Sequence, residues 1–415
     1  MREMKMAGGW EMGRSIKVVG LFAAFMAASI FSDPLSAAKV PLPDGPFAVG
    51  VRILHGEIDG RMAPFLVWYP AEKDPAAPYR YSTKISLSAR LDAAPDRAGA
   101  PYPLVLFSHG MGGCAAQHVF INEDLASHGY VVVAPDHRDS AMCHIEGGAE
   151  ISGAQLTWSV LKNNFDLSKV VMELFGGMMK SIGYDFTYRG REAHDAIDRA
   201  LAWNREPGSF LQGMIDPDRI GMSGHSLGGY TTLLVGGLPN FCGAEPPPAS
   251  ACSFQDLGLR NIPNPCCLEY MRGKDPFQYR DPRVKAIFVM SPAVMFPELD
   301  RAAASLKAPI MLVNGDDKKF EVPLEPLQAI YDHAPAPKYL IVLKDTDHMT
   351  AADATLAVSV SKFVLPGFRS HFLEKAQAYD AYSVGFFDQY LKGKAPAIDL
   401  SKPVNDFAKI WSKEQ

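Results

Sequence analysis

The chain has 415 residues, of which 47% are hydrophobic and 21% are charged, and its formal net charge is −5 at pH 7. A chain of this length and composition can bury a large core, either in one domain with insertions or in two domains. The negative charge offers no basic surface to nucleic acid, and nothing in the composition indicates long disordered segments, repeats or a coiled coil.

The first 38 residues have the pattern of a secretory signal peptide. Basic residues precede an apolar run over 18–31, and the small residues at 36–38 suit cleavage by a signal peptidase. The run is too short for a comfortable membrane span, and no second hydrophobic stretch is long enough to hold the protein in a bilayer. We therefore predict a mature protein, 39–415, that is periplasmic or secreted. A start at Met12 would give a leader of more usual length, and an uncleaved anchoring helix is the alternative.

Beyond this leader, short apolar strands alternate with helical segments. The sequence predicts strands at 47–54, 64–69, 104–107, 130–135, 220–223, 284–290, 309–313 and 339–343, and helices near 118–127, 191–203 and 379–391. The first two strands are expected to form an antiparallel pair. The alternation that follows requires a mostly parallel central sheet covered by helices on both faces, so the predicted fold class is α/β.

Two insertions interrupt this alternation. The first, at about 141–189, is rich in apolar residues and is predicted to form a helical cap over an acyl-binding cleft. Phe175, Met178 and Met179 are its candidate substrate contacts, and the alternative is that they belong to the buried face of two helices. The second insertion, at about 238–283, is a cysteine-bearing loop whose sequence indicates no ligand.

The six cysteines are interpreted in the light of the predicted export, because disulfides persist in oxidising compartments. Four of them lie in the second insertion: Cys242, Cys252, Cys266 and Cys267. Cys114 and Cys143 follow two successive predicted strands, so both are expected at the same edge of the sheet, where they could meet. Free buried thiols are the alternative, and spacing does not decide the connectivity.

Residues 224–228 read Gly-His-Ser-Leu-Gly and stand between a predicted strand and a predicted helix. This is the pattern of a nucleophile elbow, in which the serine occupies a strained turn and small residues on either side let strand and helix pass closely. Ser226 is therefore the predicted nucleophile of an acyl-transfer reaction, and Leu227 a predicted backbone donor to an oxyanion. A tight turn with an exposed serine is the alternative.

The strand 104–107 runs into a glycine-rich loop, His-Gly-Met-Gly-Gly at 109–113. A loop in this position supplies the second oxyanion donor of a nucleophile-elbow enzyme. Because glycines permit an unusual backbone, we predict that the N–H of Met111 turns towards the nucleophile together with that of Leu227. A phosphate-binding loop is the competing interpretation, but the lysine and the spacing of a Walker motif are missing.

The catalytic acid should follow the serine in the chain and stand just after a strand. Asp316 and Asp317 both follow the predicted strand 309–313. We predict Asp317, because acids in this loop commonly stand a few residues past the glycine, and Asp316 is then an N-cap or turn residue.

Eleven histidines are present, so the base is chosen by its position. His348 comes shortly after the last predicted strand, where an imidazole can swing back to Ser226, and His371 in a later helix is the second candidate. His109 and His225 belong to the turns around the serine and are expected to shape them by hydrogen bonding. His348 would take the serine proton and give it to the leaving group, while the aspartate holds the imidazole tautomer.

A cluster of potential metal ligands follows the strand 130–135: Asp136, His137, Asp139, Cys143 and His144. Their spacing matches no standard zinc pattern, and a salt-bridged loop explains them without a metal. We therefore predict neither a metal nor another cofactor.

Five segments resemble one branch of the α/β-hydrolases, the platelet-activating-factor acetylhydrolase and dienelactone hydrolase-like proteins. They read VWYP at 67–70, YPLVLFSHG at 102–110, DLASHGY at 124–130, DHRD at 136–139 and GHSLGG at 224–229. Secreted bacterial esterases, including polyester-degrading cutinases, share the region around 125–129 and the elbow. The resemblance implies the α/β-hydrolase fold and a calcium-independent serine hydrolase that acts on short or oxidised acyl esters.

The chain also departs from these relatives. Dienelactone hydrolases use a cysteine nucleophile where this chain has Ser226, which argues against that reaction. The animal acetylhydrolases place their acid after the strand that corresponds to 284–290, where this chain has Ser291 and Pro292. This difference shifts the predicted acid to Asp317.

The predicted function is an exported serine hydrolase that cleaves carboxylic esters, short-chain or lipid-like, through an acyl-Ser226 intermediate. The alternatives are an amidase or peptidase with the same triad and a non-catalytic binding protein of the same fold. The binding protein is disfavoured because the nucleophile, the base and the oxyanion glycines are all present. The expected partner is a small-molecule or lipid-like ester, and the acyl length, the alcohol and the oligomeric state stay open.

Overall fold

The computed structural model describes most of the chain beyond the predicted leader. The described residues are 43–82, 86–141, 143–147, 153–163, 173, 177, 187–239, 253–254, 259–263, 275, 277–293, 302–316, 323–346, 348, 350 and 366–414. The predicted signal peptide, 1–38, lies outside them.

In this part of the chain, ten strands form one sheet in the order β12-β11-β10-β9-β6-β4-β5-β2-β1-β3. Their bounds are β1 Ala48–Ile58, β2 Arg61–Ala71, β3 Arg90–Leu91, β4 Tyr102–Ser108, β5 Val131–Pro135, β6 Ile215–His225, β9 Val284–Met290, β10 Ile310–Gly315, β11 Lys338–Leu343 and β12 Ala408–Lys413. The strands from β11 to β5 run parallel, whereas β1 pairs antiparallel with β2, β2 with β5, and β12 with β11. The mostly parallel sheet and its antiparallel opening pair are confirmed.

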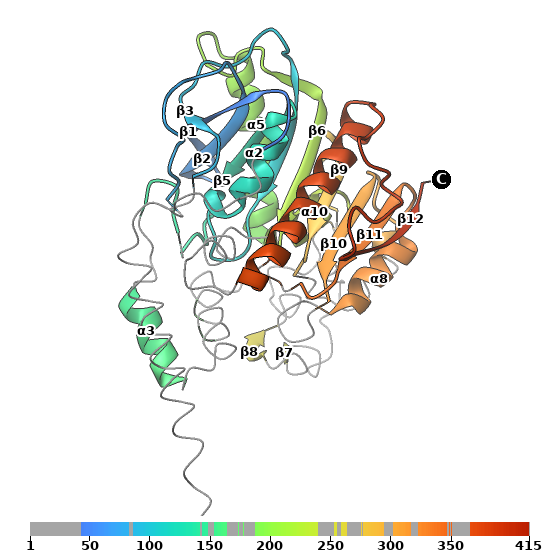
Figure 1. Cartoon of the computed structure of the whole chain (residues 1–415). Coiled ribbons are helices and arrows are strands. Elements are labelled where there is room, and N and C mark those ends of the chain that lie inside the picture. The colour runs from blue at the N-terminus through green and yellow to red at the C-terminus, as the bar shows by residue number, and fades with distance from the viewer. Residues whose placement is uncertain are drawn as a thin grey trace, which may run out of the picture.

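Helices cover both faces of this sheet (Figure 1). One face carries α5 (Thr187–Arg205), α6 (Leu227–Val235) and α8 (Leu324–His333), whose apolar residues share one core cluster. The other face carries α2 (Val119–Ser127) and the long helix α10 (Pro366–Leu391), whose apolar residues share a second cluster. The short 3-10 helix η1 (Ala115–His118) precedes α2. The predicted α/β class, with helices on both faces, is confirmed.

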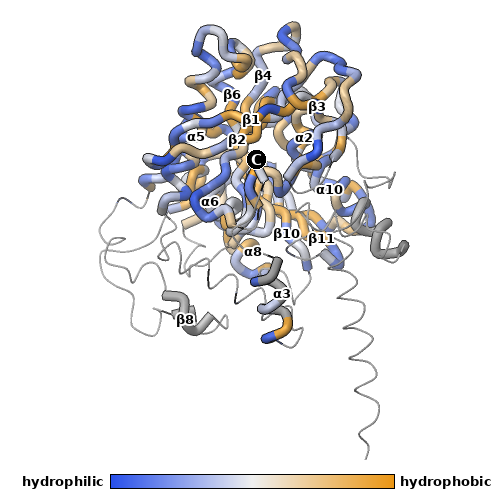
Figure 2. The backbone as a smooth tube through the Cα atoms, turned by 90° about the vertical axis from the view of Figure 1, so that its left-hand side faces the viewer, coloured by the Kyte–Doolittle hydropathy of each residue, from blue (hydrophilic) through white to orange (hydrophobic). Residues whose placement is uncertain are grey.

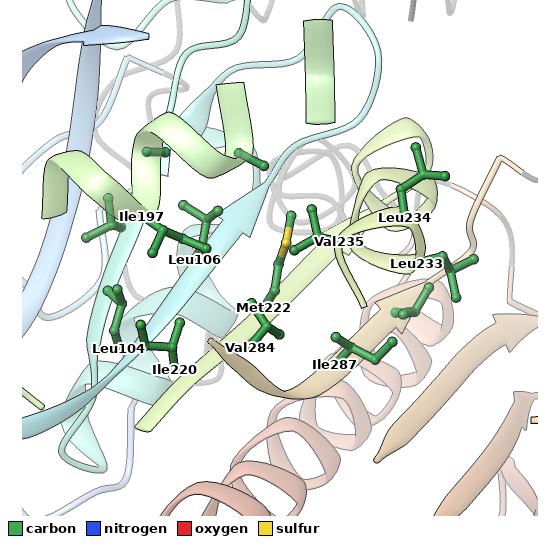
Figure 3. Packing of buried hydrophobic residues seen from close by; sticks show 14 of the residues in the cluster. Leu104, Leu106, Ile197, Ile220, Met222, Leu233, Leu234, Val235, Val284 and Ile287 are labelled. Atoms are coloured by element: carbon green, nitrogen blue, oxygen red, sulfur yellow. The ribbon is translucent and has the colours of Figure 1, made fainter. Parts of the chain in front are cut away.

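The strand sequences explain why both faces are covered. In β4, Leu104 and Leu106 belong to the first cluster, and Val105 and Phe107 to the second. Figure 3 shows the two leucines facing Ile197 of α5. Successive side chains of a strand point to opposite faces, so a strand that is apolar throughout needs a helix on each side. Figure 2 shows the same concentration of hydrophobic residues on β10 and β11.

This topology brings several loops to one edge of the sheet. Parallel strands end at the same edge, so the loops that follow β4, β5, β6, β10 and β11 gather there. Those loops contain most of the residues that the sequence marks as catalytic, and they form the candidate site.

The two insertions are described only in part. In the first, α3 (Gly153–Lys162) lies outside the layers of the sheet and its helices in both views, with Trp158 67% and Leu161 51% exposed. In the second, β7 (Ser253–Phe254) and β8 (Leu259–Pro263) form a small antiparallel sheet. Phe175, Met178 and Met179 lie outside the described residues, so the acyl cleft and the domain boundaries stay predictions.

None of the helices among the described residues combines the length and the hydrophobicity that a bilayer crossing needs.

Candidate active site

Ser226 occupies a sharp turn between strand and helix. β6 ends at His225 and α6 begins at Leu227, and Ser226 between them has φ 57° and ψ −119°. A positive φ is unfavourable for a residue with a side chain, so surrounding contacts must hold it. The Ser226 N–H donates to the carbonyl of Met290 at 3.0 Å, and the Ser226 carbonyl accepts from Ala293 N at 2.9 Å. The turn is therefore tied to the end of β9.

The two glycines of the motif are required by close backbone contacts. A Cβ on Gly224 would lie 2.3 Å from the carbonyl oxygen of Gly228, and a Cβ on Gly228 would lie 1.9 Å from the carbonyl oxygen of Ser108. Side-chain carbons do not approach backbone that closely. The small residues thus let α6 pack directly on β6 and β4, as the elbow prediction requires.

His348 lies within hydrogen-bonding distance of the serine. Its Nε2 is 2.9 Å from Ser226 Oγ, and its ring is half-buried. The neighbouring His225 donates its Nε2–H to the backbone carbonyl of His348 at 2.7 Å, and the two rings are 4.7 Å apart. His225 therefore orients the loop that carries His348, in keeping with the shaping role expected of it.

Burial keeps the neighbouring imidazoles neutral. Burial, followed by the nearby His348 and His118, holds the pKa of His225 well below its usual value. His118, whose ring centroid lies 4.9 Å from that of His225, has its pKa lowered to about 3, mainly by burial. A neutral His225 keeps its Nε2–H available for the carbonyl of His348 throughout the neutral pH range.

The two candidate acids follow β10, as predicted. Asp316 is exposed, and its Oδ1 accepts the backbone N–H of Asp345 at 2.6 Å, in a turn where Asp345 has φ 50°. The Asp316 carboxylate thus supports the turn at Asp345. Asp317 lies outside the described residues.

The loop between β4 and η1 lies against the serine. A Cβ on Gly110 would lie 3.3 Å from Ser226 Cβ, so the backbone of this loop directly adjoins the elbow. Gly112 has φ 70°, a conformation that suits glycine. Met111 between them is buried, and Leu227 is the first residue of α6, where backbone N–H groups have no intrahelical acceptor. The loop that contains Met111 and the first residue of α6 therefore both adjoin the turn at Ser226.

The polar cluster after β5 forms a network of hydrogen bonds. Asp136 accepts the backbone N–H groups of Ala115 at 2.8 Å and Ile145 at 3.0 Å. His137 joins Ser108 Oγ, at 2.9 Å from its Nε2, to Glu192, at 2.7 Å from its Nδ1. These bonds bind the loop to β4 and α5.

Asp139 of the same cluster forms a buried ion pair with Arg189 of α5 at 2.8 Å. Sequence reasoning missed Arg189 and Glu192, because their partners lie some fifty residues earlier in the chain. Among the described residues, three potential metal ligands approach one another at a different place, Asp44, Asp124 and His128.

Cys114 and Cys143 form a disulfide with a Cα–Cα distance of 5.5 Å. This confirms that the two cysteines meet at one edge of the sheet. The bond joins the loop after β4 to the loop after β5, so it ties the candidate oxyanion loop to the polar cluster. The other four cysteines lie outside the described residues.

Comparison with known proteins agrees with this arrangement. Residues 80–236 match the family described as "Platelet-activating factor acetylhydrolase, isoform II", and this segment contains β4, the candidate oxyanion loop, β5 and the elbow. The chain has the α/β-hydrolase fold, and this part of it is similar to the platelet-activating-factor acetylhydrolase-like branch. The expected resemblance is confirmed.

Individual acetylhydrolases match a part of this chain of similar length. Platelet-activating factor acetylhydrolase of Canis lupus familiaris is 32% identical over 154 residues, which are 34% of this chain and 33% of the relative. The Bos taurus protein is 30% identical over 151 residues, 33% of this chain and 32% of the relative. The match thus spans about a third of the length of these relatives, and His348 and the candidate acids lie beyond the family match.

One solved structure agrees over nearly the whole chain. It is a ferulic acid esterase from Streptomyces cinnamoneus, with a TM-score of 0.54, 19% identity, and coverage of 90% of this chain and 99% of the other. At this identity the likeness shows the fold, which is that of an α/β-hydrolase.

Proposed function

We propose that this α/β-hydrolase cleaves carboxylic esters through an acyl-serine intermediate, with Ser226 as nucleophile, His348 as base and Asp317 as acid. One observation carries the proposal: His348 Nε2 lies 2.9 Å from the Oγ of a serine held at positive φ at the start of a helix. This is the geometry of a nucleophile and its general base.

In the proposed reaction, Ser226 Oγ attacks the ester carbonyl carbon while its proton passes to His348 Nε2. The negative charge then develops on the former carbonyl oxygen, where the N–H groups of Met111 and Leu227 stabilise it. The carbon–oxygen bond to the alcohol breaks, and the alcohol leaves with the proton from His348. Water then gives a proton to the same imidazole and attacks the acyl carbon. The bond to Ser226 Oγ breaks, the carboxylic acid leaves, and His348 returns the proton to Ser226 Oγ.

The assignment of Asp317 rests on its position and on the contact made by its neighbour. It follows β10 directly after Asp316, and it precedes His348 in the order that the fold requires. Asp316 accepts a hydrogen bond from the turn at Asp345. This supports Asp317 as the carboxylate that orients His348 Nδ1.

We further propose that the substrates are short-chain or lipid-like esters and that the insertion at 141–189 helps to bind their acyl group through Phe175, Met178 and Met179. The relatives are named as acetylhydrolases and the structural neighbour as an esterase, which supports this substrate class. The chain would form one α/β-hydrolase domain, 39–415, with insertions at 141–189 and 238–283. Removal of 1–38 and the disulfide Cys114–Cys143 suit a periplasmic or secreted protein.

The proposal is tested by hydrolysis of p-nitrophenyl acetate, butyrate and octanoate by residues 39–415. Ser226→Ala and His348→Ala, each shown to be folded by circular dichroism, should lower kcat at least about 10⁴-fold. Ser223→Ala is the matched control, because this buried serine lies on β6 just before the turn and, within the described residues, its Oγ has no hydrogen-bond partner. It should keep wild-type activity.

Two outcomes would contradict the proposal. Folded wild-type protein that hydrolyses none of the three esters would contradict ester hydrolysis. Activity that survives Ser226→Ala would contradict the assigned nucleophile. An amide analogue with the same acyl group, tested beside the best ester, separates the ester hydrolase from an amidase.

A further inference from the structure

Arg189 and Asp139 form an ion pair beneath the candidate oxyanion loop. Arg189 lies in the first turn of α5 and Asp139 in the loop after β5, and Nη2 donates to Oδ2 at 2.8 Å. Both side chains are only 1% exposed. Removing two charges from water is costly, so a pair this deeply buried needs further hydrogen bonds to be stable.

Those further bonds go to the backbone of the loop 109–113. Arg189 Nη1 donates to the carbonyl of His109 at 2.9 Å, and Nη2 lies 3.3 Å from the carbonyl oxygen of Gly110. Asp139 Oδ2 accepts the N–H of Gly112 at 3.0 Å. The two charged groups therefore bind the loop from both sides of Met111.

Peptide geometry converts these contacts into a direction for Met111. The carbonyl of Gly110 and the N–H of Met111 belong to one planar peptide unit, and this bond is trans. An arginine that holds the carbonyl oxygen thus points the N–H the opposite way. The carbonyl of Met111 and the N–H of Gly112 form the next unit, which Asp139 holds in the same manner. Both peptide planes that flank Met111 are therefore fixed by the pair.

The loop so held adjoins the nucleophile. A Cβ on Gly110 would lie 3.3 Å from Ser226 Cβ. A donor that is to stabilise an oxyanion must already be oriented before charge develops, because reorganisation during the reaction would cost energy. The described contacts provide such preorganisation at Met111.

We propose that Arg189 and Asp139 are positioning residues that hold the Met111 N–H in the direction of the oxyanion formed on Ser226. The proposal rests on the ester hydrolysis proposed above. Neither residue touches the substrate; both act through the backbone of the loop.

The charges of the pair persist at neutral pH. Burial alone would raise the pKa of Asp139, but the charge and hydrogen bond of Arg189, together with the nearby His109 and His137, hold that pKa well below its usual value. Burial alone would likewise lower the pKa of Arg189, but the neighbouring Asp139 and Tyr188 raise it above its usual value. The adjacent His109 and His137 have pKa values well below the usual range because of burial, so they stay neutral and do not compete for the carboxylate.

The test uses a pair of matched substrates, an aryl ester and its thionoester with the same acyl and alcohol groups. Sulfur accepts hydrogen bonds poorly, so the oxyanion donors accelerate the oxygen ester more than the thionoester. Each kcat is divided by the rate of alkaline hydrolysis of the same substrate. The ratio of the two resulting values measures how strongly the N–H donors stabilise the oxyanion. A merely structural role for the ion pair would leave this ratio unchanged.

The variant combines Arg189→Met with Asp139→Leu, which removes both charges and leaves no unpaired one. We expect its ester kcat to fall about 10²-fold with little change in KM, the typical effect of losing one oxyanion donor. The oxygen-to-sulfur ratio should fall by a similar factor. The matched control combines Arg283→Met with Asp281→Leu, an ion pair at the opposite, amino end of β9, and should keep the ratio.

Each outcome decides between the proposals. A folded double variant with an unchanged ratio overturns the positioning role alone. Wild-type protein that hydrolyses neither ester overturns the proposed function and this inference with it. If the double variant does not fold, Arg189→Lys takes its place, because an ammonium is a point charge on a flexible stem and does not reproduce the rigid planar fork of the guanidinium. Its ratio should then fall, and an unchanged ratio overturns the proposal.

Discussion

Replacing Gly228 with alanine should separate strand β4 from helix α6 and misplace the nucleophile. The new Cβ would lie 1.9 Å from the carbonyl oxygen of Ser108, about 1.5 Å short of an ordinary contact of 3.4 Å. Ser226 precedes the first residue of α6, so a shift of that size would disturb the 2.9 Å distance from its Oγ to His348 Nε2. Because a misplacement of about 1 Å can cost on the order of 10²-fold in rate, kcat should fall at least about 10²-fold.

Gly229→Ala gives the matched comparison. Its Cβ would lie 2.9 Å from the carbonyl oxygen of Met290, so a displacement of about 0.5 Å relieves it, and kcat should fall less than about tenfold. Both variants are assayed for p-nitrophenyl ester hydrolysis well below their melting temperatures, since overpacking also costs about 1–3 kcal/mol of stability. A folded Gly228→Ala protein with wild-type kcat would contradict this prediction, as would a larger loss of kcat in Gly229→Ala.

Three further predictions concern other parts of the site and its support. Replacing Cys114 and Cys143 together by serine should cost about 3.6 kcal/mol, since the disulfide spans a sequence separation of 29, and an unchanged melting temperature would contradict this. Asp317→Asn should lower kcat about 10⁴-fold and Asp316→Asn less than about tenfold, and the reverse order in a steady-state assay would transfer the acid to Asp316. His118 has its pKa lowered from 6.5 to about 3, so the unfolded chain takes up its proton in this pH window and the folded protein does not, which destabilises the fold as pH falls. The unfolding free energy of His118→Leu minus that of wild type should therefore rise by about 2 to 3 kcal/mol as the pH falls from 7.5 to 4.5 in urea titrations. A difference that does not change with pH would count against a neutral buried imidazole.

The sheet and the elbow could be predicted because their signals are local. Apolar strands such as β4 and β9 are continuous in sequence, and the glycines around Ser226 stand at fixed spacing. β12 could not be predicted in the same way. Its residues, Ala408–Lys413, include two lysines and are mostly half-buried, and their position is decided by antiparallel pairing with β11.

The support of the site depends on partners far apart in the chain. Arg189 looks like a surface residue of a helix until Asp139 and the loop 109–113 are placed beneath it. The disulfide could be expected from the sequence, because both cysteines follow strands that end at the same edge of the sheet. Asp317 and the acyl cleft stay predictions, since they lie outside the described residues.

The most direct test of the account is to locate the covalent adduct that an alkyl fluorophosphonate forms with residues 39–415. Mass spectrometry of the digested protein should find one label, on the peptide that contains Ser226, with labelling greatly slowed in folded His348→Ala. A label on another residue would contradict the acyl-serine mechanism. So would wild-type protein that hydrolyses esters but is not labelled at Ser226 by the reagent.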